Sequence, residues 1–469
     1  MDPFDPAFDE GAFPFFDGAP PDPGERGGWA GAGADVSEDA IALRFTQDHG
    51  DTLRFDHDVG RWYQWQGTHW VPQIVPIAFH YAREIGRRLG GAKRSICKAS
   101  VAAGAERFAQ ADPRHAVTAD IWDRDPMLLA TPAGTLDLRS GRMHRPRRED
   151  YITRVTGCAP ERGTPERWLA FLDQATGGDR AMQVYLQRIA GYCLTGLTGE
   201  HALFFLYGPG GNGKSSFLNI LLHILGDYAL NAPMETFTSS RFAQHPTELA
   251  MLKGARLVTA SETEQGRSWA EARIKNLTGG DPVTARFLHR DFFTYRPQFK
   301  LLFAGNHQPT LHNVDPAMQR RFYMTPFLHS PPTPDHALED KLQEEAPRIL
   351  AWALAGCLDW QQDGLARPAS VSAATADYFA NQDLVGQWIE ECCVLGPREW
   401  EQPGILFNNW SAYARGAGEE AGTAKVFRMT LEKRGFHWSR SNGIRRHSGI
   451  ALRARGAGPS AGPSAGSAA

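Results

Sequence analysis

The sequence is poor in the features that mark secreted, zinc-binding and membrane-spanning proteins. Its 469 residues include only six cysteines, and no two of them form a Cys-x-x-Cys pair. This spacing excludes a zinc ribbon, and the adjacent Cys392 and Cys393 are poorly suited to a ring-closing disulfide. No apolar run approaches the roughly 20 residues that a membrane helix requires, and the acidic N-terminus is unlike a signal peptide. We therefore expect a cytoplasmic protein with reduced thiols and no membrane partner.

Net charge is also small, because 50 basic and 53 acidic side chains leave a formal charge of −3. The chain as a whole is not a polycation, but DNA binding depends on local charge. Residues 1–22 carry only acidic charges, whereas residues 425–455 are strongly basic. The hydrophobic content of 42% is close to the globular average, and the length predicts two to four domains.

Local patterns predict the elements that lie before residue 200. Ser37 is expected to cap a helix running through Phe45, and short strands follow at Leu53–Phe55 and Trp62–Trp65. Helices are then expected over 76–112, a hairpin over 127–138, and further helices from 165 to 197, where apolar residues recur at helical spacing.

A glycine-rich loop between a predicted strand and a predicted helix carries the strongest chemical signal. The apolar run 202–207 fits a buried parallel strand, and an amphipathic helix follows over 217–225. The loop between them matches G-x-x-x-x-G-K-[ST] in full. Its residues are Gly208, Pro209, Gly210, Gly211, Asn212, Gly213, Lys214 and Ser215, followed by Ser216. We therefore predict a nucleoside triphosphate site in a P-loop α/β fold.

The chemistry of this loop is direct. Glycines let successive backbone N–H groups converge on phosphate oxygens, and the helix N-terminus adds the positive end of its dipole. Lys214 would reach the β- and γ-phosphates, and the Ser215 hydroxyl would hold Mg²⁺. The loop alone predicts nucleotide binding and says nothing about DNA.

Two further strands are expected to bring polar side chains to the same site. The run 256–261 ends in Glu262-Thr263-Glu264, and a hydrolytic enzyme of this class needs a carboxylate at a strand end to hold Mg²⁺ and polarise water. We predict Glu262 as the principal acid and metal ligand and Glu264 as a helper, although a surface acid pair is the alternative. The run 299–304 ends in Gly305-Asn306, where Asn306 would orient the water or read the γ-phosphate.

A basic pair follows at Arg320 and Arg321. One of the two could reach the γ-phosphate of a neighbouring subunit as an arginine finger. The alternative is a solvated basic pair, and the sequence does not decide between the two arginines.

The order of these motifs resembles the superfamily 3 helicases, specifically the AAA+-related phage and plasmid primase–helicase family with its poxvirus relatives. The segment Ile274–Arg286 is the most specific, because generic P-loop proteins lack it. Upstream, 129–228 resembles the helical domain that precedes the ATPase, and 36–75 is similar to the linker before it. The other matching segments are 208–215, 257–264, 301–309 and 320–327.

This resemblance implies a homo-hexameric ring that hydrolyses ATP at subunit interfaces and threads single-stranded or forked DNA. By the same resemblance, Lys275 and the hairpin after it would face the DNA channel. The residues 283–288 and 292–295 are themselves strand-like, and His289 and Arg290 at the turn could contact a phosphate. A solvent-exposed turn in which Arg290 pairs with Asp291 is the alternative. A bacterial host cell and a phage, plasmid or prophage context would follow.

Many relatives carry an N-terminal primase with a D-x-D metal site, and this chain departs from that pattern. About 130 residues precede the helical domain, and the one tempting triplet is Asp56-His57-Asp58. We expect that triplet to be a polar turn, and we predict no primase activity in this chain. A separate primase or replication factor would then be a partner.

The C-terminal region is expected to be a second DNA-binding element. Thr423 would cap a basic helix that carries Lys425, Arg428 and Arg434, and a hairpin is expected over 436–452. A helix, a basic helix and a hairpin predict a winged helix with the basic helix in a DNA groove. A protein-docking winged helix with a solvated basic face is the alternative.

Together these patterns predict seven segments and one main function with two competitors. An ATP-gated DNA initiator or clamp shares every motif with the helicase, and a P-loop small-molecule kinase would leave 274–286 and the basic C-terminus unexplained.

The segments are a disordered acidic leader (1–34), a small α+β region (35–126), a helical domain (127–198), an ATPase core (199–345), a helical lid or linker (346–385), a winged helix (386–455) and a flexible tail (456–469).

Overall fold

The computed structural model describes residues 36–91, 93–239, 246–262, 268–288, 291–311, 315–417, 419–441 and 443–453. The expected leader and tail lie outside these ranges. The chain divides into two compact units, the first built from residues up to 309 and from 320–372, the second from 310–319 and from residue 373 onward. Within the described ranges, no helix is both long enough and apolar enough to cross a membrane.

The first unit begins with three helices packed on a small sheet, as the sequence predicts. Ser37 caps the first helix by accepting a hydrogen bond from the Ala40 amide, and buried Phe45 and Trp62 belong to the core between helices and sheet. The sheet has the order β3-β2-β1-β4. The elements are α1 (Glu38–His49), α2 (Ile77–Gly90), α3 (Ala99–Ala111), β1 (Leu53–Asp56), β2 (Arg61–Trp65), β3 (Trp70–Pro72) and β4 (Ala116–Val117).

A three-stranded antiparallel sheet and two helices follow. The predicted hairpin is present, and a third strand that the sequence patterns do not predict pairs with it. Asp179 caps the second helix by accepting from the Met182 amide. The elements are β5 (Leu128–Thr131), β6 (Gly134–Asp137), β7 (Arg142–His144), α4 (Glu166–Thr176) and α5 (Arg180–Leu194).

The centre of the first unit is a five-stranded sheet with the order β14-β8-β13-β10-β9, and all its pairs are parallel. Its three inner strands coincide with the apolar runs noted in the sequence, because strands buried on both faces need continuous apolar residues. The strands are β8 (Leu203–Tyr207), β9 (Ala229–Asn231), β10 (Leu257–Glu262), β13 (Lys300–Gly305) and β14 (Phe322–Pro326).

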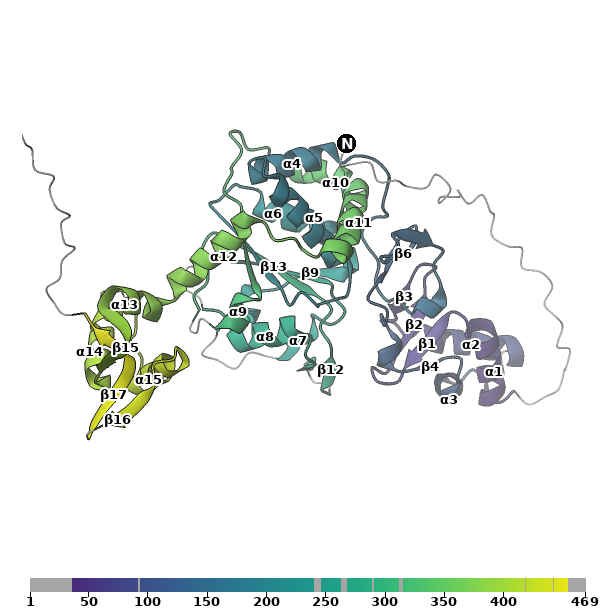
Figure 1. Ribbon diagram of the computed structural model, residues 1–469. Helices are drawn as coiled ribbons and strands as arrows, with labels where there is room; N and C mark the ends of the chain where they lie inside the picture. Colours follow the sequence, from purple (N-terminus) through teal and green to yellow (C-terminus); the bar gives the residue numbers. More distant parts are fainter. Residues whose placement is uncertain are drawn as a thin grey trace, which may run out of the picture. The chain divides into compact units, whose positions relative to one another are not determined.

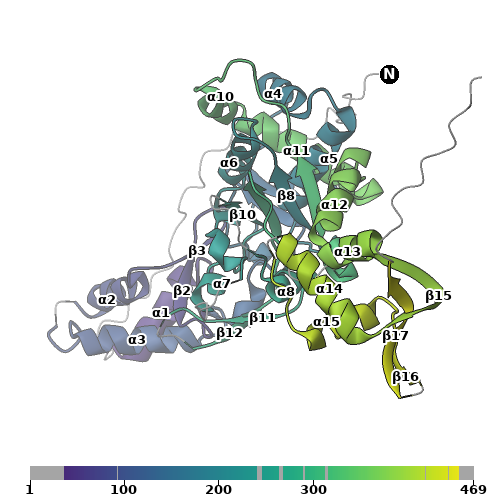
Figure 2. The same cartoon turned by 90° about the vertical axis from the view of Figure 1, so that its left-hand side faces the viewer.

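Both faces of this sheet are covered, and alternate side chains of β8 show how. The ring of Phe204 packs near Tyr185 of α5 on one face, while Phe205 meets Trp269 on the other. In Figures 1 and 2, α5, α6 and α11 lie on one side of the sheet and α7 and α8 on the other. The helices are α6 (Lys214–Leu225), α7 (Pro246–Ala250), α8 (Glu271–Gly279), α10 (Leu338–Glu344) and α11 (Ala346–Asp363).

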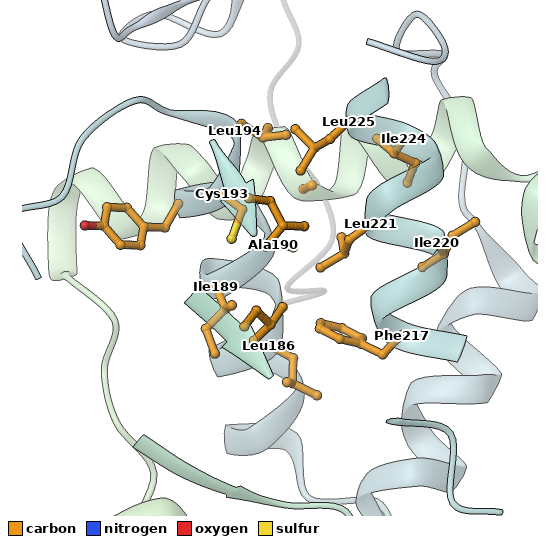
Figure 3. Close-up of a cluster of buried hydrophobic side chains, with 14 of the residues drawn as sticks. Leu186, Ile189, Ala190, Cys193, Leu194, Phe217, Ile220, Leu221, Ile224 and Leu225 are labelled. Atoms are coloured by element: carbon orange, nitrogen blue, oxygen red, sulfur yellow. The ribbon is translucent and has the colours of Figure 1, made fainter. Parts of the chain in front are cut away.

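The core between α5 and α6 fixes the start of α6 against the sheet. Figure 3 shows Leu186, Ile189 and Ala190 of α5 facing Phe217 and Leu221 of α6, and each of these five side chains is almost fully buried. This packing places the N-terminus of α6, and with it the glycine-rich loop, at the carboxyl end of β8.

The second unit contains helices packed on a three-stranded antiparallel sheet with the order β15-β17-β16. Thr423 caps α15, as predicted, by accepting from the Val426 amide. Buried Trp388, Trp410 and Phe427 form its core. The elements are α9 (Pro316–Gln319), α13 (Leu384–Cys392), β15 (Cys393–Glu401), α14 (Pro403–Gly416), α15 (Ala424–Lys433), β16 (Trp438–Ser441) and β17 (Ile444–Leu452), and α12 (Ala369–Gln382) spans the division between the units.

The observed division differs from the predicted segments in two places. The segment 346–385, predicted as a lid or linker, is divided: α11 packs against α5 and belongs to the first unit, while residues from 373 belong to the second. Residues 310–319 leave the expected core segment and join the second unit, where the Leu311 amide donates to Gln382 Oε1. Chain order alone carries no signal for either contact.

Candidate functional site

Three strand ends lie in one row across the central sheet. Tyr207, the last residue of β8, pairs with Gly305 at the end of β13, and Gly305 pairs with Glu262 at the end of β10. The glycine-rich loop continues from Tyr207, and Asn306 continues from Gly305. Because the strands are parallel, the loop, Asn306 and the strand end at Glu262 lie at the same edge of the sheet, which is where ligands bind in open α/β folds.

The loop is held by its neighbours at both ends and is open in the middle. A Cβ on Gly208 would lie 1.9 Å from the Phe327 carbonyl oxygen, and one on Gly213 would lie 2.6 Å from the Phe171 ring. At Gly210 and Gly211, no atom of the described residues other than their chain neighbours lies within 4 Å of such a position. Gly211 and Gly213 adopt φ values of +75° and +87°, which favour glycine. The loop is therefore fixed at Gly208 and Gly213, and its crest, Gly210 and Gly211, is free and lined by backbone.

Lys214 is the first residue of α6 and is 6% exposed. Its Nζ donates to the Gly208 and Pro209 carbonyl oxygens, at 2.8 and 2.9 Å, and to Asn212 Oδ1 at 2.8 Å. Burial lowers the pKa of the Lys214 ammonium. The amine thus lies inside the loop on three neutral oxygens, none of which compensates a full positive charge as an anion would.

Asn212 links the loop to the edge strand, a role that the sequence does not predict. The side chain is 2% exposed, and its Nδ2 donates to the Phe327 carbonyl while its Oδ1 accepts from Lys214. Phe327 directly follows β14. The sequence offers one signal for this role, namely an amide residue at a position of the motif that any residue can occupy.

The remaining predicted residues of the nucleotide site divide by what the structure describes. Ser215 and Ser216 occupy the first turn of α6, and Ser215 is exposed. Asn306 is exposed at the end of β13. Glu262 is the last residue of β10, whereas the sequence predicts a strand that ends at residue 261 with Glu262 directly after it. Glu264 lies outside the described residues.

The two candidate finger arginines lie at the opposite edge of the sheet. The Arg321 carbonyl accepts from the Leu203 amide at the start of β8, whereas the loop follows the end of that strand. Five strand residues separate these levels, about 16 Å at 3.3 Å per residue. Arg320 is exposed, while Arg321 is half-buried and its Nε donates to Thr278 Oγ1 at 3.2 Å. Within one chain, neither arginine lies beside the loop.

The predicted hairpin after α8 is present but short, formed by β11 (Val283–Ala285) and β12 (Phe293–Tyr295). Lys275 is half-buried on α8. His289 and Arg290 lie outside the described residues. Beside them, Phe287, Leu288 and Phe292 are exposed, and the Arg286 guanidinium lies 4.6 Å from the centre of the Phe292 ring.

The Asp56-His57-Asp58 triplet is a polar turn, as predicted. Asp56 is fully buried and accepts from the Asp58 and Val59 amides and from Trp122 Nε1. Asp58 accepts from the Ala119 amide, and His57 Nε2 bonds the Gln110 carbonyl. Hydrogen bonds within the turn and to residues 110–122 therefore account for all three side chains.

The three basic residues predicted for DNA binding on α15 differ in their surroundings. Lys425 is exposed near the start of the helix. Arg428 pairs with Glu432 at 3.5 Å and lies over the Trp438 ring. Arg434 forms a two-point ion pair with Asp383, with one contact at 3.0 Å. Two of the three guanidinium or ammonium groups are therefore already engaged inside the unit.

Two family models match the chain and together cover just over half of it. The model described as "D5 N terminal like" matches residues 42–177, and the model described as "Family of unknown function (DUF5906)" matches residues 206–321, from the end of β8 to the start of β14. This is the domain order of phage and viral primase–helicases. It places the glycine-rich loop, Glu262, Asn306 and both arginines inside one family match, as the resemblance implied.

Two curated relatives of the chain come from large DNA viruses. The "Putative helicase L207/L206" of Acanthamoeba polyphaga mimivirus is 28% identical over 236 residues, which is 45% of this chain and 25% of the relative. The "Putative helicase 022R" of Frog virus 3 (isolate Goorha) is 26% identical over 260 residues, which is 50% of this chain and 26% of the relative. The matched region thus spans about a quarter of each relative.

A solved structure shares the fold. It is titled "The A form apo structure of NrS-1 C terminal region-CTR", and it matches with a TM-score of 0.52 at 10% identity, covering 89% of this chain and 100% of that chain. This likeness confirms a mixed α/β fold around a parallel sheet.

Proposed function

We propose that the chain is an ATP-dependent DNA helicase or translocase of phage or plasmid type replication, a superfamily 3 motor acting as a ring, most simply a hexamer, on single-stranded or forked DNA. One observation carries the proposal: the glycine-rich loop, Glu262 and Asn306 lie at the ends of three neighbouring strands, at the same edge of one parallel sheet. The names of the viral relatives support the same class of activity.

The residues of the loop fit a triphosphate with Mg²⁺. The open crest at Gly210 and Gly211 leaves room for phosphate oxygens against backbone N–H groups. Lys214 would transfer its hydrogen bonds from the loop carbonyls to the β- and γ-phosphates. Ser215, at the helix N-terminus, and Glu262 would hold the metal ion, and Mg²⁺ neutralises charge that develops on the phosphates.

Hydrolysis also needs a positioned water. Glu262 would polarise it, Glu264 would assist, and Asn306 would orient it or read the γ-phosphate. These roles need carboxylate and amide groups within hydrogen-bond reach of the attacking oxygen.

The far position of the arginines supports a shared site. Because Arg320 and Arg321 lie at the opposite edge of their own sheet, a finger role requires a second copy of the chain. Arg320 is the better candidate, since it is exposed while Arg321 donates to Thr278. An arginine brought to the γ-phosphate in this way would make ATP turnover depend on ring assembly.

DNA would be contacted by both units. In the first, Lys275 and the β11–β12 hairpin with His289 and Arg290 would line the channel. In the second, α14, α15 and the β16–β17 hairpin have the order of helices and strands of a winged helix, which would bind DNA. A separate primase or replication factor is the partner that this role would require.

ATPase and strand-displacement assays on forked DNA test the proposal. Wild-type chain should hydrolyse ATP faster with DNA and displace a strand. Lys214→Ala and Glu262→Gln should each lower turnover by about 100-fold or more, the usual loss when a charge-stabilising group is removed. Lys341→Ala, which removes a lysine whose side chain is 45% exposed and pairs with Asp335 at the surface, serves as the matched loss of a lysine and should behave like wild type.

The same assays separate a motor from an ATP-gated clamp. ATP binding with no turnover in the presence of DNA would contradict the motor and support the clamp. DNA-stimulated turnover that survives Lys214→Ala would contradict both.

A further inference from the structure

The hairpin of β16 and β17 carries two arginines directly opposite each other. Arg440 of β16 pairs with Arg445 of β17, next to the turn that joins the strands. Both side chains are exposed, and the end of the hairpin extends beyond α14 and α15 (Figure 2). Trp438 and His447 form the equivalent pair two positions further along the ladder, so these four side chains share one face of the sheet.

This arginine pair has no acidic residue within its own hairpin, and on the neighbouring strand β15 Glu401 pairs with His447, two positions along β17 from Arg445. No Asp or Glu occurs between residues 436 and 453, and neither Arg440 nor Arg445 forms an ion pair with any described residue; the one polar contact is from Arg440 Nε to the Gly443 carbonyl at 3.4 Å. Two other arginines of the unit are engaged. Arg434 binds Asp383, and Arg453 donates to the carbonyls of Cys393 and Glu390.

Like charges placed directly opposite on neighbouring strands destabilise the pairing. An anion that accepts hydrogen bonds from both guanidinium groups reverses the sign of that interaction, and phosphate, like carboxylate, matches the paired N–H groups of arginine. The arrangement therefore suits a ligand that supplies phosphates to an exposed edge.

The surroundings of Trp438 favour contact with the backbone of the nucleic acid over stacking with its bases. The guanidinium of Arg428 lies 5.5 Å from the centre of the Trp438 ring and covers one face of it, while Trp438 is 39% exposed, so only one face of this ring is left for the base stacking that single strands use. Sequence-independent phosphate contact to a duplex fits the face better.

We propose that the β16–β17 hairpin binds the phosphate backbone of duplex DNA through Arg440 and Arg445, and that this hairpin, more than the basic face of α15, supplies the affinity of the C-terminal unit. The inference rests on the proposed function in one respect, namely that DNA is the partner. It adds two binding residues that the basic-helix hypothesis does not include.

Fluorescence anisotropy with a labelled duplex, titrated with the full chain without nucleotide at several salt concentrations, tests the inference. Each phosphate contact on B-DNA contributes about 0.9 to the slope of log affinity against log salt. Arg440→Ala/Arg445→Ala should therefore reduce the slope by about 1.8 and weaken binding at low salt by at least tenfold. Arg440→Lys/Arg445→Lys should keep most of the slope.

A matched loss of charge is the control. Arg398→Ala/Arg415→Ala removes two exposed arginines from β15 and α14 of the same unit, and its slope should stay near that of the wild type. An equal fall in this control would mean that bulk charge carries the effect and would overturn the inference. Absence of duplex binding by the wild-type chain would overturn it too.

A structural role for the pair is checked by thermal unfolding. Since the two arginines repel each other, the alanine variant should unfold at the same temperature as wild type or higher, and a clear fall would contradict the inference.

The titration contains no nucleotide, so a chain that binds duplex through the hairpin but lacks ATPase activity would refute the motor and leave the inference standing. A DNA-stimulated ATPase whose affinity ignores Arg440 and Arg445 would do the reverse.

Discussion

Arg256 and Lys300 are two buried cations at the amino ends of the neighbouring strands β10 and β13. Arg256 donates to the carbonyls of Leu194 and Leu128, and Lys300 donates to those of Thr195, Leu197 and Gln298. Helix α5 ends at Leu194, and the last carbonyls of a helix have no partner within it. The two side chains thus satisfy the end of α5 and attach it to the sheet.

The pH dependence of stability should report on Lys300. Burial lowers the pKa of its ammonium to about 7, well below the value of an exposed lysine. Between about pH 7 and pH 10 the Lys300 side chain therefore binds more protons in the unfolded chain than in the folded chain. Its contribution makes the free energy of unfolding rise with pH over this range. Below pH 7 both states are protonated and the contribution to the slope vanishes.

We expect the wild type to gain up to about 1.4 kcal/mol per pH unit over Lys300→Met between pH 7.5 and 9.5, the value for one proton. Urea unfolding at several pH values measures it. Taking the difference between the two proteins cancels most of the effect of buried thiols such as Cys193, whose pKa is raised to about 12 by burial. Parallel slopes for the two proteins would show that Lys300 is not the titrating group.

At the scale of elements, Asp383 joins two helices of the second unit. Its carboxylate caps α13 by accepting from the Gly386 amide at 2.9 Å, and it also binds Arg434 just after α15. One side chain therefore fixes the start of one helix relative to the end of another.

Replacing Asp383 should destabilise the second unit in a graded way. Asp383→Ala removes both contacts and should cost about 1–2 kcal/mol, the usual value for a lost cap. Asp383→Asn keeps a capping oxygen and should lose less than half of that. Urea unfolding followed by the fluorescence of buried Trp388 and Trp410 measures both variants; equal losses for alanine and asparagine would place the effect in the ion pair alone.

Elements with a strong local pattern could be predicted from the sequence. The strands β8, β10 and β13 are continuous apolar runs, and the loop after β8 is a complete motif, so these three strands and the meeting of their polar ends were predictable, whereas their order in the sheet was not. Ser37 and Thr423 were predictable caps, because a hydroxyl before a helical pattern has one common use.

Other elements lack such a pattern, and β15 is the clearest case. It is an edge strand, interrupted by a register shift between Leu395 and Trp400, and it contains Gly396 and Pro397. An edge position tolerates proline because one side of the strand needs no hydrogen-bond donors. The Asn212–Phe327 link and the Arg256 and Lys300 contacts also join residues far apart in the chain, so no local spacing predicts them.

At the scale of the whole molecule, the account combines two separable activities. The first unit would bind and hydrolyse ATP at the edge where β8, β10 and β13 end, and the second would hold DNA through an arginine-bearing hairpin. Arg320 and Arg321 lie at the opposite edge of the sheet from the loop, so in this proposal they would contact only a nucleotide bound to a neighbouring copy of the chain. Ring assembly is therefore part of the chemistry in this proposal.

The most direct measurement is an experimental structure of the full chain with Mg²⁺, a non-hydrolysable ATP analogue and forked DNA. The account predicts that the phosphates lie on Gly208–Ser215, that Lys214 Nζ has left the Gly208 and Pro209 carbonyls for phosphate oxygens, and that Glu262 and Asn306 flank the γ-phosphate. A nucleotide bound elsewhere, or Glu262 and Asn306 directed away from the phosphates, would contradict it.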